Sequence, residues 1–255
     1  MLWYKSWLET RWRFLIGLAL LIVSATGTVL VYPRVAGILA APPKVDVSGE
    51  IGRRVMEAIE LSRDYRGYVW SQWFRQNMPQ MWVLFAVLIG TGGLLSQGSG
   101  GGALFTLSLP ITRQRLLAIR AATGLAELVV MAFVPSLFVT MFSPAIGQSY
   151  SLGDALVHSA CLFIAGTTFF SLAFLLSTVF ADIWRPALLA CLVAAALAVT
   201  AEVVREFWRF SVFRVMTAEI YFRDGRLPWL GLLASAALST AMLYAAARNI
   251  SRQDF

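Results

Sequence analysis

The sequence predicts an all-α, polytopic membrane protein with six transmembrane helices, and two observations support that fold class. Hydrophobic residues make up 58% of the 255 residues and charged residues only 14%, whereas a soluble domain carries about 25% charged residues. Apolar stretches of about 20 residues, long enough to cross a bilayer, recur along the chain. We expect one transmembrane domain over residues 1–255. The predicted spans are residues 14–32, 80–96, 121–142, 153–178, 187–203 and 228–247.

The first 13 residues predict an amphipathic helix that lies in the membrane interface. Its aromatic and charged side chains fall on roughly opposite faces: Trp3, Trp7 and Phe14 against Lys5, Glu9 and Arg13. A signal peptide is the competing interpretation, because positive charges precede the first apolar run. That run is longer than the 7–15 residues typical of a signal sequence, so we expect residues 14–32 to form a span.

Two longer polar segments, residues 33–79 and 204–227, predict helical excursions outside the membrane. In the first, Pro33, Pro42 and Pro43 are expected to break the chain before a helix. Aromatic residues then gather where the chain should re-enter the interface: Tyr65, Tyr68, Trp70, Trp73 and Phe74. The second excursion mixes aromatic and basic residues, which favours an interfacial helix.

Three local signals mark the remaining spans. Pro135 should kink the third span. Ser151 followed by Asp154 fits a capping box that opens the fourth. Cys161 and Cys191 both lie inside predicted spans, where buried cysteine behaves as a small hydrophobic residue.

Residues 97–120 carry the most informative pattern in the chain. A glycine run, a short apolar piece, a proline and three arginines without any acid stand between two predicted spans. Cationic hairpin tips are retained on the cytoplasmic side. Pro110 disfavours helical backbone at Leu109 but is suited to the first turn of a new helix. We therefore expect a short helix over 103–108 at a cytoplasmic tip, with the next helix beginning near Pro110.

The same segment argues against an enzyme. The glycines at 98–102 could suggest a phosphate-binding loop, but such a loop needs a lysine directly after its last glycine, and none follows here. We expect no catalytic residues in this chain and no ability to hydrolyse ATP alone. The single histidine and two cysteines do not form a zinc-type spacing, so no metal or cofactor is expected. The net charge of +7 fits cationic flanks against anionic lipids rather than nucleic acid.

The tip resembles the cytoplasmic coupling segment of ABC-2 type ABC transporter permeases, in which a glycine lead precedes Leu-x-Leu-Pro-x-x-Arg. The matching residues are Gly102, Leu107, Leu109, Pro110 and Arg113. The entry at residues 5–13 and the closing residues 252–255 are similar to the same family. The resemblance implies a permease subunit in which a separate ATPase docks on the tip. The expected docking residues are Leu104, Phe105, Leu107, Leu109, Pro110 and Arg113.

The resemblance also implies partners, location and orientation. It implies a separate ATPase subunit that holds ATP and Mg, a second permease subunit (identical or paralogous), and export across the bacterial cytoplasmic membrane. Both termini would be cytoplasmic. Twelve Lys and Arg residues then fall in outer segments and nine in inner ones, so the total count opposes this orientation. The inner segments are short and adjoin span ends, where the positive-inside rule is most reliable, and the resemblance favours termini inside.

Two ionisable residues inside predicted spans are candidate polar sites. Glu127 is seven residues from Arg120, so both lie on one helix face, about 10 Å apart along the axis. We expect Glu127 to have a structural partner near the cytoplasmic interface rather than to relay protons. His158 lies one turn after Asp154, on the same face, and we expect interfacial hydrogen bonding there.

Two other functions remain open at this stage. A secondary transporter or channel, not driven by ATP, would show inverted repeats or broken helices with midplane ligands, to which Pro135 and Glu127 offer thin support. An intramembrane hydrolase would need a serine near His158 with an oxyanion site.

Overall fold

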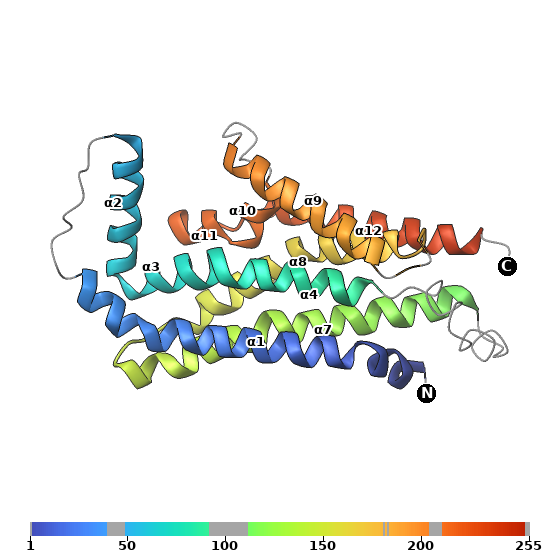
Figure 1. Cartoon of the computed structure of the whole chain (residues 1–255), viewed down its shortest axis with the longest axis horizontal. Coiled ribbons are helices and arrows are strands. Elements are labelled where there is room, and N and C mark those ends of the chain that lie inside the picture. Colours follow the sequence, from blue (N-terminus) through green and yellow to red (C-terminus); the bar gives the residue numbers. More distant parts are fainter. Residues whose placement is uncertain are drawn as a thin grey trace.

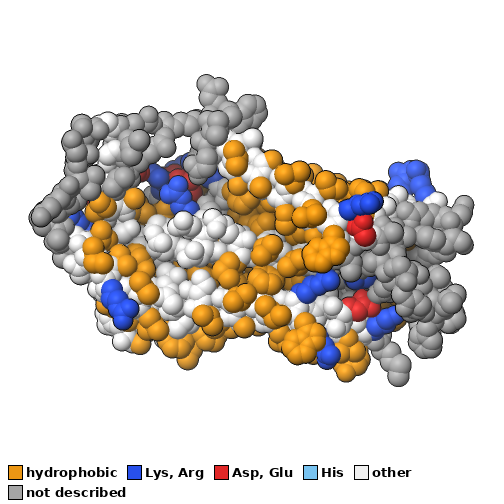
Figure 2. Space-filling model, in the orientation of Figure 1, with side chains coloured by type: hydrophobic (Ala, Val, Ile, Leu, Met, Phe, Trp, Pro, Cys, Tyr) orange, Lys and Arg blue, Asp and Glu red, His pale blue; other side chains and the backbone are white. Residues whose placement is uncertain are grey.

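The computed structural model describes residues 2–39, 49–91, 112–180, 182, 184–203 and 211–252, and all regular elements in these ranges are helical (Figure 1). Four helices are long and apolar enough to cross a membrane: Leu2–Leu39, Gln114–Ile146, Leu152–Leu176 and Trp229–Ser251. The described residues therefore confirm the all-α fold and contain four of the helices that a multi-pass membrane protein would need. Hydrophobic side chains spread over the middle of the surface in Figure 2, and charged ones gather toward its ends.

Helix α1 (Leu2–Leu39) is one continuous helix of 38 residues. At 1.5 Å per residue it is about 57 Å long, well beyond the roughly 30 Å of a hydrocarbon core. The sequence predicted a separate interfacial helix over 1–13 and a break at Pro33. No glycine or proline separates residue 13 from the apolar run, and the helix also continues through Pro33 to Leu39, as membrane helices tolerate.

A second helical run follows the short helix α2 (Glu50–Arg63). It consists of α3 (Tyr65–Val69), the π-helical segment η1 (Trp70–Asn77) and α4 (Met78–Gly90), joined without a gap. Its aromatic residues, which the sequence predicted at a membrane interface, are buried inside the protein. Trp70 and Trp73 are fully buried and Phe74 is 2% exposed, because they pack against neighbouring helices. The run therefore enters the bundle earlier than the predicted start of its span at residue 80.

Helix α8 (Leu152–Leu176) is the centre of the bundle. In its most apolar stretch 61% of residues are buried inside the protein, against 22% for α1 and α12. It packs against α4, α7 (Arg113–Phe142) and α12 (Trp229–Ser251). Gly166 permits one of these contacts, since a Cβ there would lie 2.4 Å from the Trp82 ring. Small residues allow such close approach of membrane helices.

The ends of the bundle differ in character. The start of α1, the end of α4, the start of α7 and the end of α12 lie together at one end in Figure 1. We call this the terminal end. At the opposite end lie α2, α3, α10 (Val212–Met216) and α11 (Glu219–Asp224). Helix α9 (Trp184–Val203) packs on α8 and α4 and exposes Leu188 and Leu192. The 3-10 turn η2 (Ser143–Ile146) continues α7.

Candidate functional site

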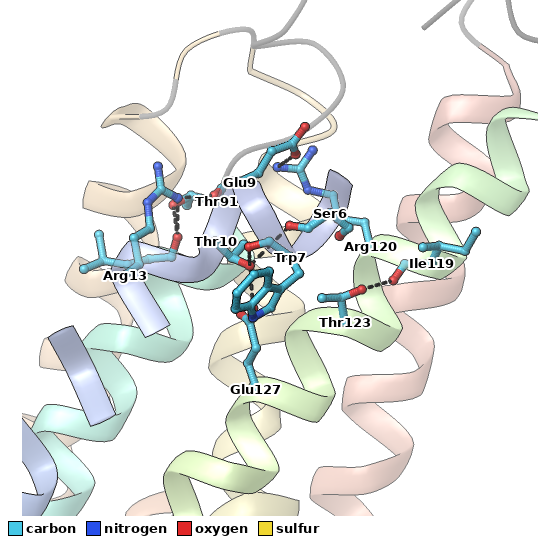
Figure 3. Close-up of polar contacts among 11 residues, drawn as sticks. Ser6, Trp7, Glu9, Thr10, Arg13, Thr91, Ile119, Arg120, Thr123 and Glu127 are labelled. Atoms are coloured by element: carbon cyan, nitrogen blue, oxygen red, sulfur yellow. Dashed lines mark hydrogen bonds and ion pairs between the residues drawn. The ribbon is translucent and has the colours of Figure 1, made fainter. Parts of the chain in front are cut away.

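Three side chains of α1 bind the two helices on either side of residues 92–111 (Figure 3). We call Glu9, Thr10 and Arg13 the N-terminal clamp. Arg13 Nη1 donates to the Leu88 carbonyl at 2.7 Å and to the Thr91 carbonyl at 2.8 Å, at the end of α4. Glu9 and Thr10 instead contact α7. The clamp thus ties α4 and α7 to the same turns of α1.

The sequence places the clamp by helical spacing. Ser6, Thr10, Gly17 and Leu21 are buried along α1, at intervals of three and four or their sum, which is the pattern of one helix face. Gly17 brings that face close to both neighbours. A Cβ at Gly17 would lie 2.7 Å from Met131 of α7 and 2.7 Å from Phe85 of α4. The contact of α1 with α4 and α7 therefore continues below the polar groups as tight apolar packing.

Arg13 donates to two carbonyl groups at the end of α4, and the Leu88 carbonyl also accepts from Thr91 Oγ1 at 3.0 Å. The last four carbonyls of a helix have no intrahelical donor, and Arg13 reaches the two at Leu88 and Thr91. A cation at this position also interacts favourably with the negative end of the helix dipole. Thr91 is fully buried, so water is a poor substitute for the guanidinium at its carbonyl.

On α7, the clamp contacts Arg120 and Glu127. Arg120 Nη2 lies 3.4 Å from Glu9 Oε2, and both side chains are mostly buried. Thr10 Oγ1 donates to Glu127 Oε1 at 2.5 Å, and Glu127 is 5% exposed. The shared face of Arg120 and Glu127 is therefore covered by α1. The structural partner of Glu127 is Thr10, whereas the carboxylate that pairs with Arg120 is Glu9.

The structure describes none of the predicted docking side chains. Leu104, Phe105, Leu107, Leu109 and Pro110 fall outside the described residues, as does the side chain of Arg113. The described chain resumes at Thr112, and Arg113 begins α7. The clamp therefore contacts Leu88 and Thr91, which precede the first predicted docking residue, Leu104, by 16 and 13 residues, and Arg120, which follows the last, Arg113, by seven.

His158 belongs to a separate group at the opposite end of the bundle. Thr10 of the clamp and Tyr32 are 22 residues apart on α1, which is about 33 Å along the helix axis. Tyr32 packs on Tyr65 and Tyr68 at the end of the bundle opposite the clamp. The His158 ring is 1% exposed and stacks on Phe74 with centroids 4.6 Å apart. The structure therefore does not bring His158 and Glu127 together into one polar path.

Neither a metal centre nor a serine-histidine pair is formed by the described residues. They contain no group of three or more His, Cys, Asp or Glu side chains that could hold a metal ion. Ser159, next to the histidine, donates to Ser136 Oγ at 2.7 Å. Among the described residues, no serine hydroxyl is hydrogen-bonded to the His158 ring. Cys161 and Cys191 are both free thiols.

Comparisons with known protein families, with curated proteins and with solved structures found no match to this chain. Sequence analysis did not find Thr10 or the role of Arg13. The one signal in the sequence for these two residues was the presence of polar side chains on the helix face that is otherwise buried against other helices.

Proposed function

We propose that this chain is the permease subunit of an ATP-binding cassette exporter whose ATP is hydrolysed by separate ATPase subunits. The observation that carries the proposal is the N-terminal clamp. It binds both helices that border residues 92–111, within which the Leu-x-Leu-Pro-x-x-Arg pattern of residues 107–113 begins. A partner that pushes on this segment acts on α4 and α7 together, because α1 ties them to one another.

In the proposed mechanism, the polar contacts of the N-terminal clamp transmit the movement of the docking segment to the helices. ATP binding would close the ATPases and displace the docking segment. Arg13 would carry the displacement into α4, and Arg120 with Glu127 would carry it into α7. Helices α1, α4 and α7 would then move as one body against α8 and α12, which shifts the bundle between inward-open and outward-open states.

Six crossings complete the proposed topology. The run from Tyr65 to Gly90 supplies the second crossing, since its 26 residues extend about 39 Å. Helix α9 supplies the fifth. The terminal end of the bundle, which carries the clamp, would face the cytoplasm together with both termini. The end with α2, α10 and α11 would lie on the outer side of the bacterial cytoplasmic membrane.

The proposed complex contains two permease subunits and two ATPases, with ATP and Mg in the ATPases. Large apolar side chains exposed on α9, such as Leu188 and Leu192, would face lipid or the second permease. We propose a lipid-like or hydrophobic cargo, because the helices are apolar and nearly free of charge. Failure of every amphiphilic compound tested to stimulate ATP hydrolysis by the complex would contradict this cargo class.

Purification of the tagged full chain from its native membranes tests the proposal. We expect an ATPase with a nucleotide-binding motif to purify with it in a fixed ratio and to hydrolyse ATP in the complex. The same purification with Leu107→Asp should lose the ATPase. A matched control is Ser108→Asp, which adds the same charge but keeps the apolar anchors. Transport driven by an ion gradient without ATP, in vesicles of the purified chain, would instead support a secondary transporter.

A further inference from the structure

A hollow opens between the first turns of α1 and the start of α7, next to the N-terminal clamp. It contains about 350 Å³ of empty space, part of which is open to the surroundings. Its lining includes Lys5, Ser6 and Glu9 from α1 and Leu116, Ile119 and Arg120 from α7. Residues three or four apart lie on one helix face, so two facing helix surfaces form the hollow. In Figure 3, Ser6 and Glu9 lie beside Arg120.

The charged part of the lining carries more positive than negative charge. Lys5 and Arg120 are cations, and Glu9 is a carboxylate whose Oε2 lies 3.4 Å from Arg120 Nη2. A guanidinium has five N–H donors and an ammonium has three, so both cations can bind a further acceptor while Arg120 keeps Glu9. The lining therefore favours a ligand with a negative charge and several acceptor oxygens, such as a phosphate.

The rest of the lining suits the less polar part of a ligand. Leu116 and Ile119 present aliphatic side chains to the hollow from α7. Ser6 is 8% exposed, and its hydroxyl, which bonds to no described residue, can donate to an oxygen inside the hollow. Charged, hydroxyl and aliphatic groups thus line one small space. This combination matches an amphipathic ligand better than a simple inorganic ion.

The hollow lies at the depth where lipid headgroups would be. The exposed apolar side chains of α1 begin at Leu15, six residues after Glu9, which is about 9 Å along the helix axis. Headgroups occupy roughly 5–8 Å on each side of the hydrocarbon core. Exposed aromatic side chains surround the same turns of α1: Trp3, Tyr4, Trp7 and Trp12. Trp and Tyr gather at the headgroup level of membrane proteins, so the first turns of α1 fit that level.

We propose that this hollow binds the headgroup phosphate of an anionic phospholipid. Lys5, Ser6 and Arg120 hold the phosphate oxygens, and the glycerol with the start of one acyl chain lies along Leu116 and Ile119. Basic pockets between membrane helices bind anionic headgroups in this way. The bound lipid contacts α1 and α7 together and so reinforces their association beside the clamp. The site requires that the chain lies in a membrane, but it does not depend on an ATPase partner.

Native mass spectrometry of the purified full chain tests the site. The chain is freed of native lipid in a neutral detergent and titrated with phosphatidylglycerol. We expect one lipid to bind saturably, whereas phosphatidylcholine and phosphatidylethanolamine bind weakly. Lys5→Gln removes one cation and should weaken phosphatidylglycerol binding about fivefold, the contribution typical of one basic residue near headgroups. Lys5→Arg keeps the charge and should bind as the wild type does.

The matched control is Arg248→Gln. Arg248 is exposed in the last turn of α12, at the same end of the bundle, and does not line the hollow. Its replacement lowers the net charge as Lys5→Gln does, and it should leave the affinity for phosphatidylglycerol unchanged. Thermal unfolding establishes that each variant is folded. Ser6→Ala, which removes only a hydroxyl and should weaken binding less, serves if Lys5→Gln does not fold.

Three results would overturn the proposal. The first is equal phosphatidylglycerol affinity in the wild type and the folded hollow variants, and the second is an equal loss in Arg248→Gln. The third is phosphatidylcholine or phosphatidylethanolamine bound as tightly as phosphatidylglycerol. Inorganic phosphate is added as a competitor in the same titration, and we expect it not to displace the lipid. Displacement at equal concentration would assign the hollow to free phosphate instead.

Discussion

Thr10 and Glu127 are 117 residues apart in sequence, yet the Thr10 hydroxyl donates to the Glu127 carboxyl at 2.5 Å. This bond makes the single carboxyl inside α7 part of the contact between α1 and α7. Glu127 Oε2 has no partner among the described residues, so Thr10 is the one group that satisfies this side chain. The pair therefore adds a buried polar contact to the packing of α1 on α7.

The first prediction concerns this pair. Glu127→Gln retains the shape and can still hydrogen-bond to Thr10, so it should leave transport largely intact across the physiological pH range. Thr10→Val keeps the shape of residue 10 but leaves the Glu127 carboxyl buried without a partner. It should destabilise the chain by about 1–3 kcal/mol. Thermal unfolding in detergent and transport assays measure both. Complete loss of transport in a folded Glu127→Gln variant would indicate a proton relay instead.

Replacing Arg13 should destabilise the protein more than replacing an exposed arginine of the same helix. Arg13→Ala leaves the buried Thr91 carbonyl without its donor, whereas the Leu88 carbonyl keeps the Thr91 hydroxyl as a donor. We expect the free energy of unfolding to fall by about 1–3 kcal/mol. Hydrogen exchange should rise at the end of α4, near residues 86–91. Arg34→Ala, exposed at the other end of α1, is the control and should change neither. Unchanged exchange in Arg13→Ala would remove the clamp from the proposed mechanism.

Two glycines of α1 provide a direct test of its packing. Gly17→Ala places a Cβ 2.7 Å from the buried Phe85 ring, and we expect overpacking to cost about 1–3 kcal/mol. Gly27→Ala meets no atom within 4 Å and should be neutral or slightly stabilising. The unfolding temperatures of the two variants should therefore move apart. Equal effects would contradict the close contact of α1 with α4 and α7.

The proposed orientation predicts which side of the membrane each segment faces. Single cysteines at Ser99→Cys and Ser48→Cys, in a background without Cys161 and Cys191, should react from opposite sides of sealed cells. An impermeant thiol reagent added outside should label position 48 only. Both background cysteines are free thiols, so their removal breaks no disulfide. Labelling of position 99 from outside would reverse the topology.

The fold class could be predicted because the length of an apolar stretch can be read from each helix alone, without knowing how the helices pack. It did not predict the burial of Trp70, Trp73 and Phe74. Aromatic residues suit both an interface and a packed core, and composition cannot distinguish these environments. The continuity of α1 through Pro33 was missed for a related reason. A proline breaks a helix in water more readily than in a bundle whose neighbours hold it.

The candidate site was predicted only in its outline. The spacing of Arg120 and Glu127 correctly placed both on one face, but their partners, Glu9 and Thr10, lie more than 100 residues earlier. Pairing over that distance depends on how helices pack, which periodicity does not report. Ser151 is the exception, because its cap is local. Its Oγ accepts from the Asp154 backbone N–H at 3.3 Å, as the sequence pattern indicated.

The measurement that tests the central claim most directly is ATP-driven transport by the reconstituted complex carrying Leu107→Asp. Truncating an apolar anchor at the centre of an interface often costs about 2 kcal/mol or more of binding free energy. We predict that Leu107→Asp releases the ATPase or uncouples ATP hydrolysis from transport, while membrane insertion and the Ser108→Asp control remain normal. Full ATP-driven transport by Leu107→Asp, or a wild-type chain that never binds an ATPase, would contradict the proposed function.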